Sequence, residues 1–248
     1  MWGACAAEPL PEPDPVVEGD RGLCGEQAWL TDDGPDGRVV CETPLGTRIE
    51  VYPDSRPRTV DRVASVADAM AESPAMASVV ADTTLLVAPP ERDLNALPEL
   101  ADLALPGLEW SAIEGLAMYW GPEFEAYAPT VAIRHDSVER WNLGVAHELL
   151  HLVLHDLGPE VQAEALELRR AMLAKGQTPA PGADEHELFA YFGQWRLAGY
   201  GALIAETEPE LDSWLEMHLG AAQIGARGTS DEQANWAIEE LRRWFRGN

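Results

Sequence analysis

The chain has 248 residues, 46% of them hydrophobic, which is enough to bury a sizeable core in one domain. Its 17 Lys and Arg side chains against 43 Asp and Glu give a formal net charge of -26. This charge repels the phosphate backbone of nucleic acids, so no nucleic-acid partner is expected. No apolar run approaches the roughly 20 residues that span a bilayer, so no transmembrane helix is expected either.

Residues 1–20, "MWGACAAEPLPEPDPVVEGD", are rich in Pro, Glu and Asp. Such a composition cannot pack a core, so we expect a disordered leader or tether before a domain at 21–248. The small residues before Cys5 resemble the end of a bacterial lipoprotein signal. That resemblance implies a lipid anchor through Cys5 and export to the cell envelope, or secretion. A charged start and an apolar h-region are missing, and the alternative is an ordinary disordered N-terminus with an incidental cysteine.

Two further cysteines, Cys24 and Cys41, flank a turn-rich segment that contains "DDGPDG". These turn residues are expected to fold the chain back on itself, so that the two thiols could meet. If the protein is exported, a Cys24–Cys41 disulfide is expected. In a cytosolic protein the two residues would remain free thiols.

The first half of the domain is predicted to alternate strands and helices. Clustered β-branched residues predict two strands around residues 44–46, which would form a hairpin. Apolar residues at helical spacing predict a helix over 57–80, which Pro74 ends or kinks. Further strands are expected at 82–90, 114–121 and 129–135, in that order.

From residue 136 onward the chain is predicted to be helical. Asp136 and Glu139 form a capping-box pattern at the start of a helix that Gly158-Pro159 terminates. The further helices are expected at 159–176, 184–200, 208–220 and 230–245. The fold class is therefore α+β, with a small mixed sheet followed by a helical C-terminal part.

The helix after Asp136 contains His147-Glu148-Leu149-Leu150-His151, an HExxH motif. His147 and His151 lie one helical turn apart on one face, so that both can bind one Zn²⁺. Glu148 lies beside the metal, where it can accept a proton from water. His155 is eight residues beyond His147, a rise of ~12 Å, and cannot bind the same ion. The alternative is a core helix that tolerates histidines.

The motif and the strand predicted at 130–134 before it resemble the zincin metallopeptidases. In that superfamily an edge strand pairs with extended peptide substrates. The resemblance implies a zincin-like fold for this chain and places the strand at 130–134 at the edge of the sheet.

Downstream, Glu187-Leu188-Phe189-Ala190 resembles the E-x-F-A pattern of gluzincins. The resemblance implies that Glu187 is the third zinc ligand, on a helix that runs beside the HExxH helix. Asp184, Glu185 and His186 are competing ligands. Glu187 could instead pair with Asp184 in a capping box at the start of the helix.

The combined pattern predicts zinc-dependent hydrolysis of peptide bonds in peptides or proteins, with His147, His151 and Glu187 as metal ligands and Glu148 as the base. A donor to the developing oxyanion is expected from among Tyr191, Tyr200, His186 and His218. One alternative is a tethered, non-catalytic binding module that retains a zinc-peptidase fold. Another is a zinc hydrolase that acts on a non-peptide amide.

Overall fold

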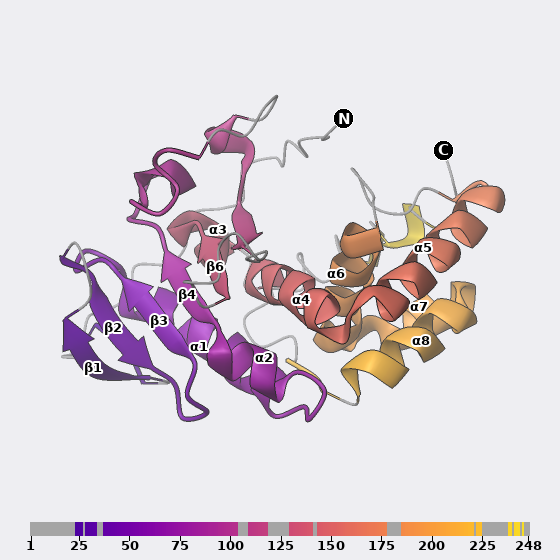
Figure 1. The fold of residues 1–248 in the computed structure, drawn as a ribbon, viewed down its shortest axis with the longest axis horizontal. Coiled ribbons are helices and arrows are strands. Elements are labelled where there is room, and N and C mark those ends of the chain that lie inside the picture. Colours follow the sequence, from indigo (N-terminus) through magenta and orange to yellow (C-terminus); the bar gives the residue numbers. More distant parts are fainter. Residues whose placement is uncertain are drawn as a thin grey trace.

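The fold is known from a computed structural model of the chain (Figure 1). It describes residues 23–26, 28–33, 37–103, 109–118, 129–140, 143–177, 185–220, 222–224, 238–239, 241–243 and 245. The leader at 1–20, with Cys5, lies outside these residues, as does most of the helix predicted at 230–245. Within the described residues, no helix combines the length and the hydrophobicity needed to cross a membrane.

The strands form one mixed sheet in the order β1-β2-β3-β4-β6-β5 (Figure 1). β3, β4 and β6 run parallel to one another, whereas β1, β2 and β5 each pair antiparallel. The bounds are β1 (Trp29–Asp33), β2 (Val39–Glu42), β3 (Arg48–Val51), β4 (Thr84–Val87), β5 (Gly115–Met118) and β6 (Thr130–Ile133). A mixed sheet with helices in series after it agrees with the α+β class.

Both faces of the sheet are covered, which explains why β4 and β6 are apolar after the threonine that begins each of them. Leu85 and Val87 belong to a core on one face together with the buried sides of the helices α1 (Pro57–Ala71) and α4 (Leu143–Leu157). Leu86 belongs to a second core on the other face. The second core is completed by residues of 88–100 and by Trp110 and Ile113; short 3-10 turns lie at Leu94–Ala96 and Trp110–Ala112. The site-bearing helix α4 therefore packs directly on a buried sheet.

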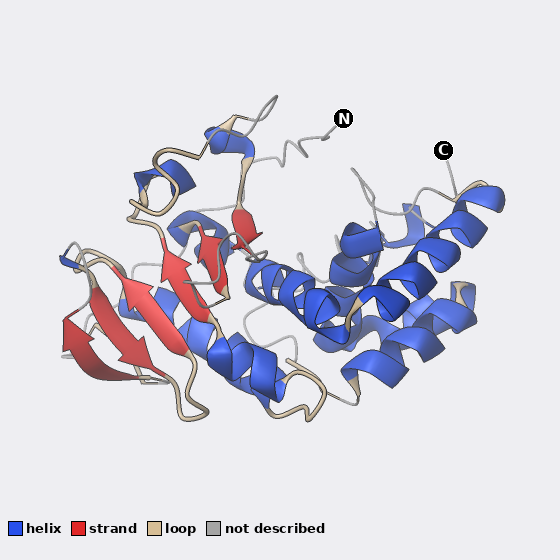
Figure 2. Cartoon of the chain, in the orientation of Figure 1, coloured by secondary structure: helices blue, strands red, loops and turns tan. Residues whose placement is uncertain are grey.

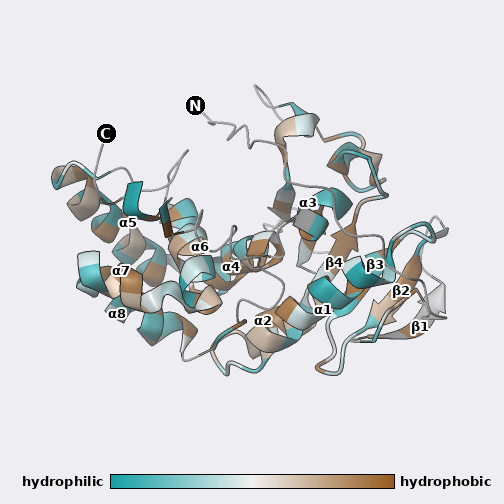
Figure 3. Ribbon diagram, turned by 180° about the vertical axis from the view of Figure 1, so that it is seen from behind, coloured by the Kyte–Doolittle hydropathy of each residue, from teal (hydrophilic) through white to brown (hydrophobic). Residues whose placement is uncertain are grey.

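The helices predicted at 159–176 and 208–220 are present over almost their full lengths, and the one predicted at 57–80 ends before Pro74 and is followed by a short second helix (Figure 2). The helix at Gly201–Thr207 was not predicted. Hydrophilic and hydrophobic residues alternate along α1, because only one of its sides is buried (Figure 3). The bounds are α1 (Pro57–Ala71), α2 (Ala77–Asp82), α3 (His135–Arg140), α4 (Leu143–Leu157), α5 (Pro159–Ala174), α6 (Glu185–Trp195), a π-helical segment (Arg196–Tyr200), α7 (Gly201–Thr207) and α8 (Pro209–Leu219). Helices α5 to α8 form a second half of the molecule, with α4 between them and the sheet (Figure 1).

Two sequence-based assignments need correction. No strand was predicted in the turn-rich segment between Cys24 and Cys41, but Trp29–Asp33 forms β1 and pairs antiparallel with β2. The helix predicted to start at Asp136 is two helices, α3 and α4, and Asp136 does not cap: one of its carboxylate oxygens accepts a hydrogen bond from Arg134 and the other has no partner. The predicted end of α4 is confirmed, because Gly158 has a φ of 88° that ordinary residues avoid.

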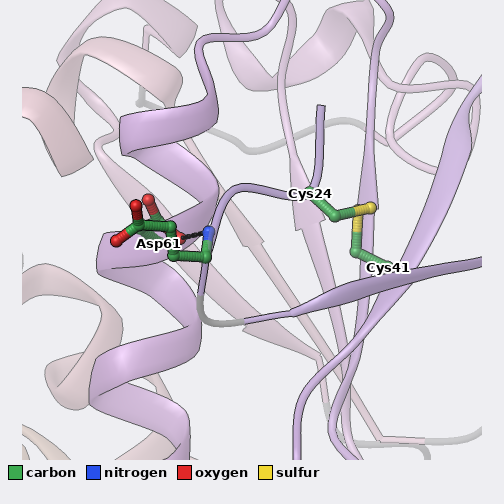
Figure 4. Close-up of a disulfide and its surroundings, with 4 residues drawn as sticks. Cys24, Cys41 and Asp61 are labelled. Atoms are coloured by element: carbon green, nitrogen blue, oxygen red, sulfur yellow. Dashed lines mark hydrogen bonds between the residues drawn. A yellow bond between two sulfur atoms is a disulfide. The ribbon is translucent and has the colours of Figure 1, made fainter. Parts of the chain in front are cut away.

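Cys24 and Cys41 form a disulfide that joins the described start of the chain to β2 (Figure 4). Both residues are buried. The backbone N–H of Glu26 also donates a hydrogen bond to Asp61 of α1, at 2.5 Å (Figure 4). The predicted pairing is thus confirmed, and the segment at 23–26 is attached to both the sheet and the helix that covers it.

His135 gives the fold a testable dependence on pH. The side chain is 2% exposed, and its Nε2 lies 3.2 Å from the backbone nitrogen of Arg56 and 3.1 Å from Thr59 Oγ1. Burial lowers the pKa of His135 below 6.5, with the charge of Arg56 adding to the effect and that of Glu139 opposing it. The unfolded chain therefore binds a proton more readily than the folded chain at mildly acidic pH.

The expected result is that His135 destabilises the fold progressively as the pH falls below 6.5. Urea unfolding of the wild type and of His135→Gln, measured between neutral and mildly acidic pH, gives the difference in the free energy of unfolding. On acidification the free energy of unfolding should fall further in the wild type than in His135→Gln. If both proteins lose stability in parallel, His135 does not titrate as described.

Candidate metal centre

Two neighbouring helices, α4 and α6, bring three metal-binding side chains together. α4 is anchored by apolar residues on most of its circumference, among them Val145, Leu149 and Val153, which are fully buried. This burial fixes the rotation of the helix and leaves His147 and His151 one turn apart, facing α6. Glu187 lies on α6 near its start and faces the two imidazoles.

The geometry of the three side chains fits a single small cation. The Nε2 atoms of His147 and His151 are 3.2 Å apart, and the Glu187 carboxylate oxygens lie 3.4 Å from His147 Nε2 and 3.6 Å from His151 Nε2. Ligand atoms that surround Zn²⁺ tetrahedrally at its usual bond lengths are separated by about 3.3–3.4 Å. All three candidate ligand atoms lie within 4.8 Å of one another, and each side chain is at most 15% exposed.

The two histidines differ in protonation: only His151 is held in the neutral form that a metal requires. Burial lowers the pKa of His151 to about 3, and the neighbouring His147 adds to the shift, so His151 is neutral at physiological pH. Burial also lowers the pKa of His147, but the hydrogen bond to Glu187 and the charges of Glu148 and Glu187 outweigh it and raise the pKa overall. A cation among the three side chains would replace the proton that His147 and Glu187 share.

Glu148 occupies the position next to this cluster and is not one of its converging ligands. Loss of hydration raises the pKa of its carboxyl group to about 7, and the charge of Glu187 contributes to the shift. His147 and a hydrogen bond from the backbone of Ala117 oppose it. A carboxylate with a pKa near neutrality can both accept and release a proton at physiological pH.

Comparison with protein-family models, with curated proteins and with solved structures gives no match.

The structure separates the four candidate oxyanion donors into two pairs. The Tyr191 ring packs edge-on against His147, with centroids 4.9 Å apart, and the His186 ring lies 6.5 Å from His151. Tyr200 instead packs against Trp195, and His218 lies beside Glu164 and Trp214 on the far helices. Tyr191 and His186 therefore remain beside the cluster, and the other two do not.

The other residues considered as metal ligands lie outside the cluster or outside the described residues. His155 is exposed and is not part of the cluster, as predicted from its distance along the helix. Asp184 lies outside the described residues, and so does the side chain of Glu185. His186 is near the histidine pair but is not among the converging ligands.

One expectation about the sheet is wrong. The strand at 130–134 was expected at the edge of the sheet, but β6 lies between β4 and β5, and β5 is the edge strand among the described residues. The reason is that β5 pairs antiparallel with the side of β6 that faces away from β4, so β6 becomes an inner strand. Sequence analysis also missed that β5 contacts Glu148, although a glycine inside a strand, here Gly115, often marks a place where another group approaches closely.

Proposed function

We propose that the protein is a zinc metallopeptidase that hydrolyses peptide bonds in peptides or proteins. One observation carries the proposal: two imidazole nitrogens and a carboxylate converge at tetrahedral spacing, and a second carboxylate, Glu148, lies close enough to interact electrostatically with His147 and Glu187. Two histidines and one carboxylate are a ligand set typical of catalytic zinc, which keeps one position open.

Each residue has a distinct role in this mechanism. His147, His151 and Glu187 would hold the metal, and a bound zinc ion would lower the pKa of water and polarise the scissile carbonyl. Glu148 accepts a proton from the attacking water and passes it to the leaving amine. Tyr191, packed against His147, is our candidate to donate a hydrogen bond to the developing oxyanion.

A peptide is the substrate class best suited to the neighbouring sheet edge. In an antiparallel ladder, backbone groups point alternately toward and away from the partner strand. Glu114 O accepts from Arg134 N at 2.9 Å, so the alternation turns the backbone groups of Gly115 and Ala117 outward from β5. The Ala117 N–H donates to Glu148, so a peptide would pair through the Gly115 backbone groups and the Ala117 carbonyl. An extended peptide could pair with this edge next to the cluster, as in β-strand addition.

The arrangement also supports our proposal of a zincin-like fold. A sheet precedes the HExxH helix, and a carboxylate comes from α6, which packs beside α4. The Cys24–Cys41 disulfide further supports an exported protein, because disulfides persist mainly in oxidising compartments.

The decisive experiment compares the wild type with Glu148→Gln in an untargeted peptide-cleavage profile with added zinc. The variant should bind zinc as tightly as the wild type, because Glu148 is not a ligand. Its turnover should fall by about 10²–10⁴-fold, because an amide cannot act as the base. Glu206→Gln, an exposed position on α7, is the matched control and should cleave like the wild type.

Two results would contradict the proposal. If Glu148→Gln cleaves peptides as fast as the wild type, Glu148 is not the base. If the wild type binds zinc but cleaves no peptide, the alternative of a non-catalytic binding module gains support.

A further inference from the structure

The edge strand β5 approaches Glu148 more closely than most side chains would allow. A Cβ atom added to Gly115 would lie 2.6 Å from both Cγ and Oε1 of Glu148 and 2.8 Å from its Cδ. Non-bonded contacts this short do not occur between real side chains, so even alanine at position 115 would force the glutamate to move. Gly115 therefore provides the space that the Glu148 side chain occupies.

The second contact comes from the strand backbone two residues later. Ala117 donates a backbone hydrogen bond to the Glu148 carboxylate. This amide points away from β6, because Ala117 alternates with residues whose backbone groups face the ladder. The outward-facing N–H of Ala117 on the edge strand is thus paired with the Glu148 carboxylate.

We propose that β5 is a positioning element for the catalytic base: Gly115 admits the Glu148 side chain and the Ala117 N–H holds its carboxylate beside His147 and Glu187. The proposal rests on the proposed function, since it assigns the two residues to the orientation of Glu148. A glutamate has several rotatable bonds, and fixing its carboxylate before the reaction removes an entropic cost from the proton transfer. The contact also links the base to the strand edge on which a peptide would pair.

Amide hydrogen exchange tests the contact without any substrate. In the ¹⁵N-labelled, zinc-free chain, the Ala117 amide should exchange slowly, and Glu148→Ala should accelerate it by about tenfold, the loss expected for one hydrogen bond. Gly115→Ala should do the same. The double variant should exchange no faster than Glu148→Ala alone, because both changes remove one shared interaction.

Two controls separate this effect from general loosening. The Arg134 amide, which bonds to Glu114 O across the β5–β6 ladder, should keep its exchange rate in every variant. Gly144→Ala makes the same substitution on α4, where the new Cβ would meet Ile133 Cδ1 at an ordinary 3.7 Å. It should leave the Ala117 amide unchanged. Unchanged Ala117 exchange in Glu148→Ala would overturn the proposal.

Turnover supplies the second readout. Gly115→Ala should lower kcat by about 10–100-fold through misplacement of the base, while KM and zinc affinity stay near wild-type values. Gly144→Ala should retain full kcat. Equal kcat in Gly115→Ala and the wild type would overturn the proposal, whereas a wild type that cleaves nothing would refute the proposed function and leave the exchange result to stand by itself.

Discussion

Replacing Glu187 with alanine is expected to weaken zinc binding by at least about tenfold, because the change removes one of three protein ligands from a four-coordinate site. The carboxylate also supplies the negative charge that offsets part of the charge of the ion. Its oxygens lie 3.4 Å and 3.6 Å from the two Nε2 atoms, so they would share one ion with both histidines. Competition with a zinc indicator, on protein purified without chelator, measures the effect.

Thermal or denaturant stability offers a second measurement. Zinc at about 100 times its dissociation constant stabilises a folded protein by about 2.7 kcal/mol, whereas a tenfold weaker site gains about 1.4 kcal/mol at the same concentration. The zinc-dependent increase in stability should therefore be about half as large in Glu187→Ala as in the wild type, or smaller.

Glu185→Ala is the matched control, because the two glutamates are on the same helix but about 200° apart around its axis. It should bind zinc like the wild type. If Glu187→Ala keeps its zinc and His186→Ala loses it, His186 is the third ligand and the E-x-F-A resemblance is misleading.

The parts of the fold that depend on short-range patterns were predictable. The hairpin of β2 and β3, the strand β4 and the helices α1 and α5 follow from β-branched clusters, from apolar residues at helical spacing and from Pro or Gly at the ends. Local patterns were ambiguous where side chains had two available partners. Asp136 had the sequence of a helix cap, but its carboxylate accepts from Arg134.

The order of strands could not be predicted in the same way. β5 and β6 are both recognisable, but which of them takes the edge depends on pairing between distant segments, and alternation within each strand carries no information about it. Gly115 illustrates the consequence. Its presence inside a strand was visible, but its contact with Glu148 arises only because β5 lies at the edge beside α4.

The candidate metal ligands likewise divide into two that a local pattern predicts and one that depends on a contact between distant segments. His147 and His151 are four residues apart on one helix, so helical geometry alone places them together. Glu187 lies on α6, separated from α4 by the whole of α5, and no periodicity relates the two helices. Only the resemblance to a known pattern singled it out among Asp184, Glu185 and His186.

Reduction of the Cys24–Cys41 disulfide is expected to lower the free energy of unfolding by about 3 kcal/mol, because the bond closes a loop of moderate length in the unfolded chain. The two cysteines are 17 residues apart, and the loop between them contains β1, so the bond also keeps this outermost strand next to β2. Urea unfolding with and without reductant measures the change, with free thiols verified by mass. The Cys24→Ala/Cys41→Ala variant should match the reduced wild type and should not respond to reductant, which separates this bond from any effect of Cys5. An unchanged wild-type midpoint after complete reduction would mean that the sheet and α1 hold this segment without the covalent link.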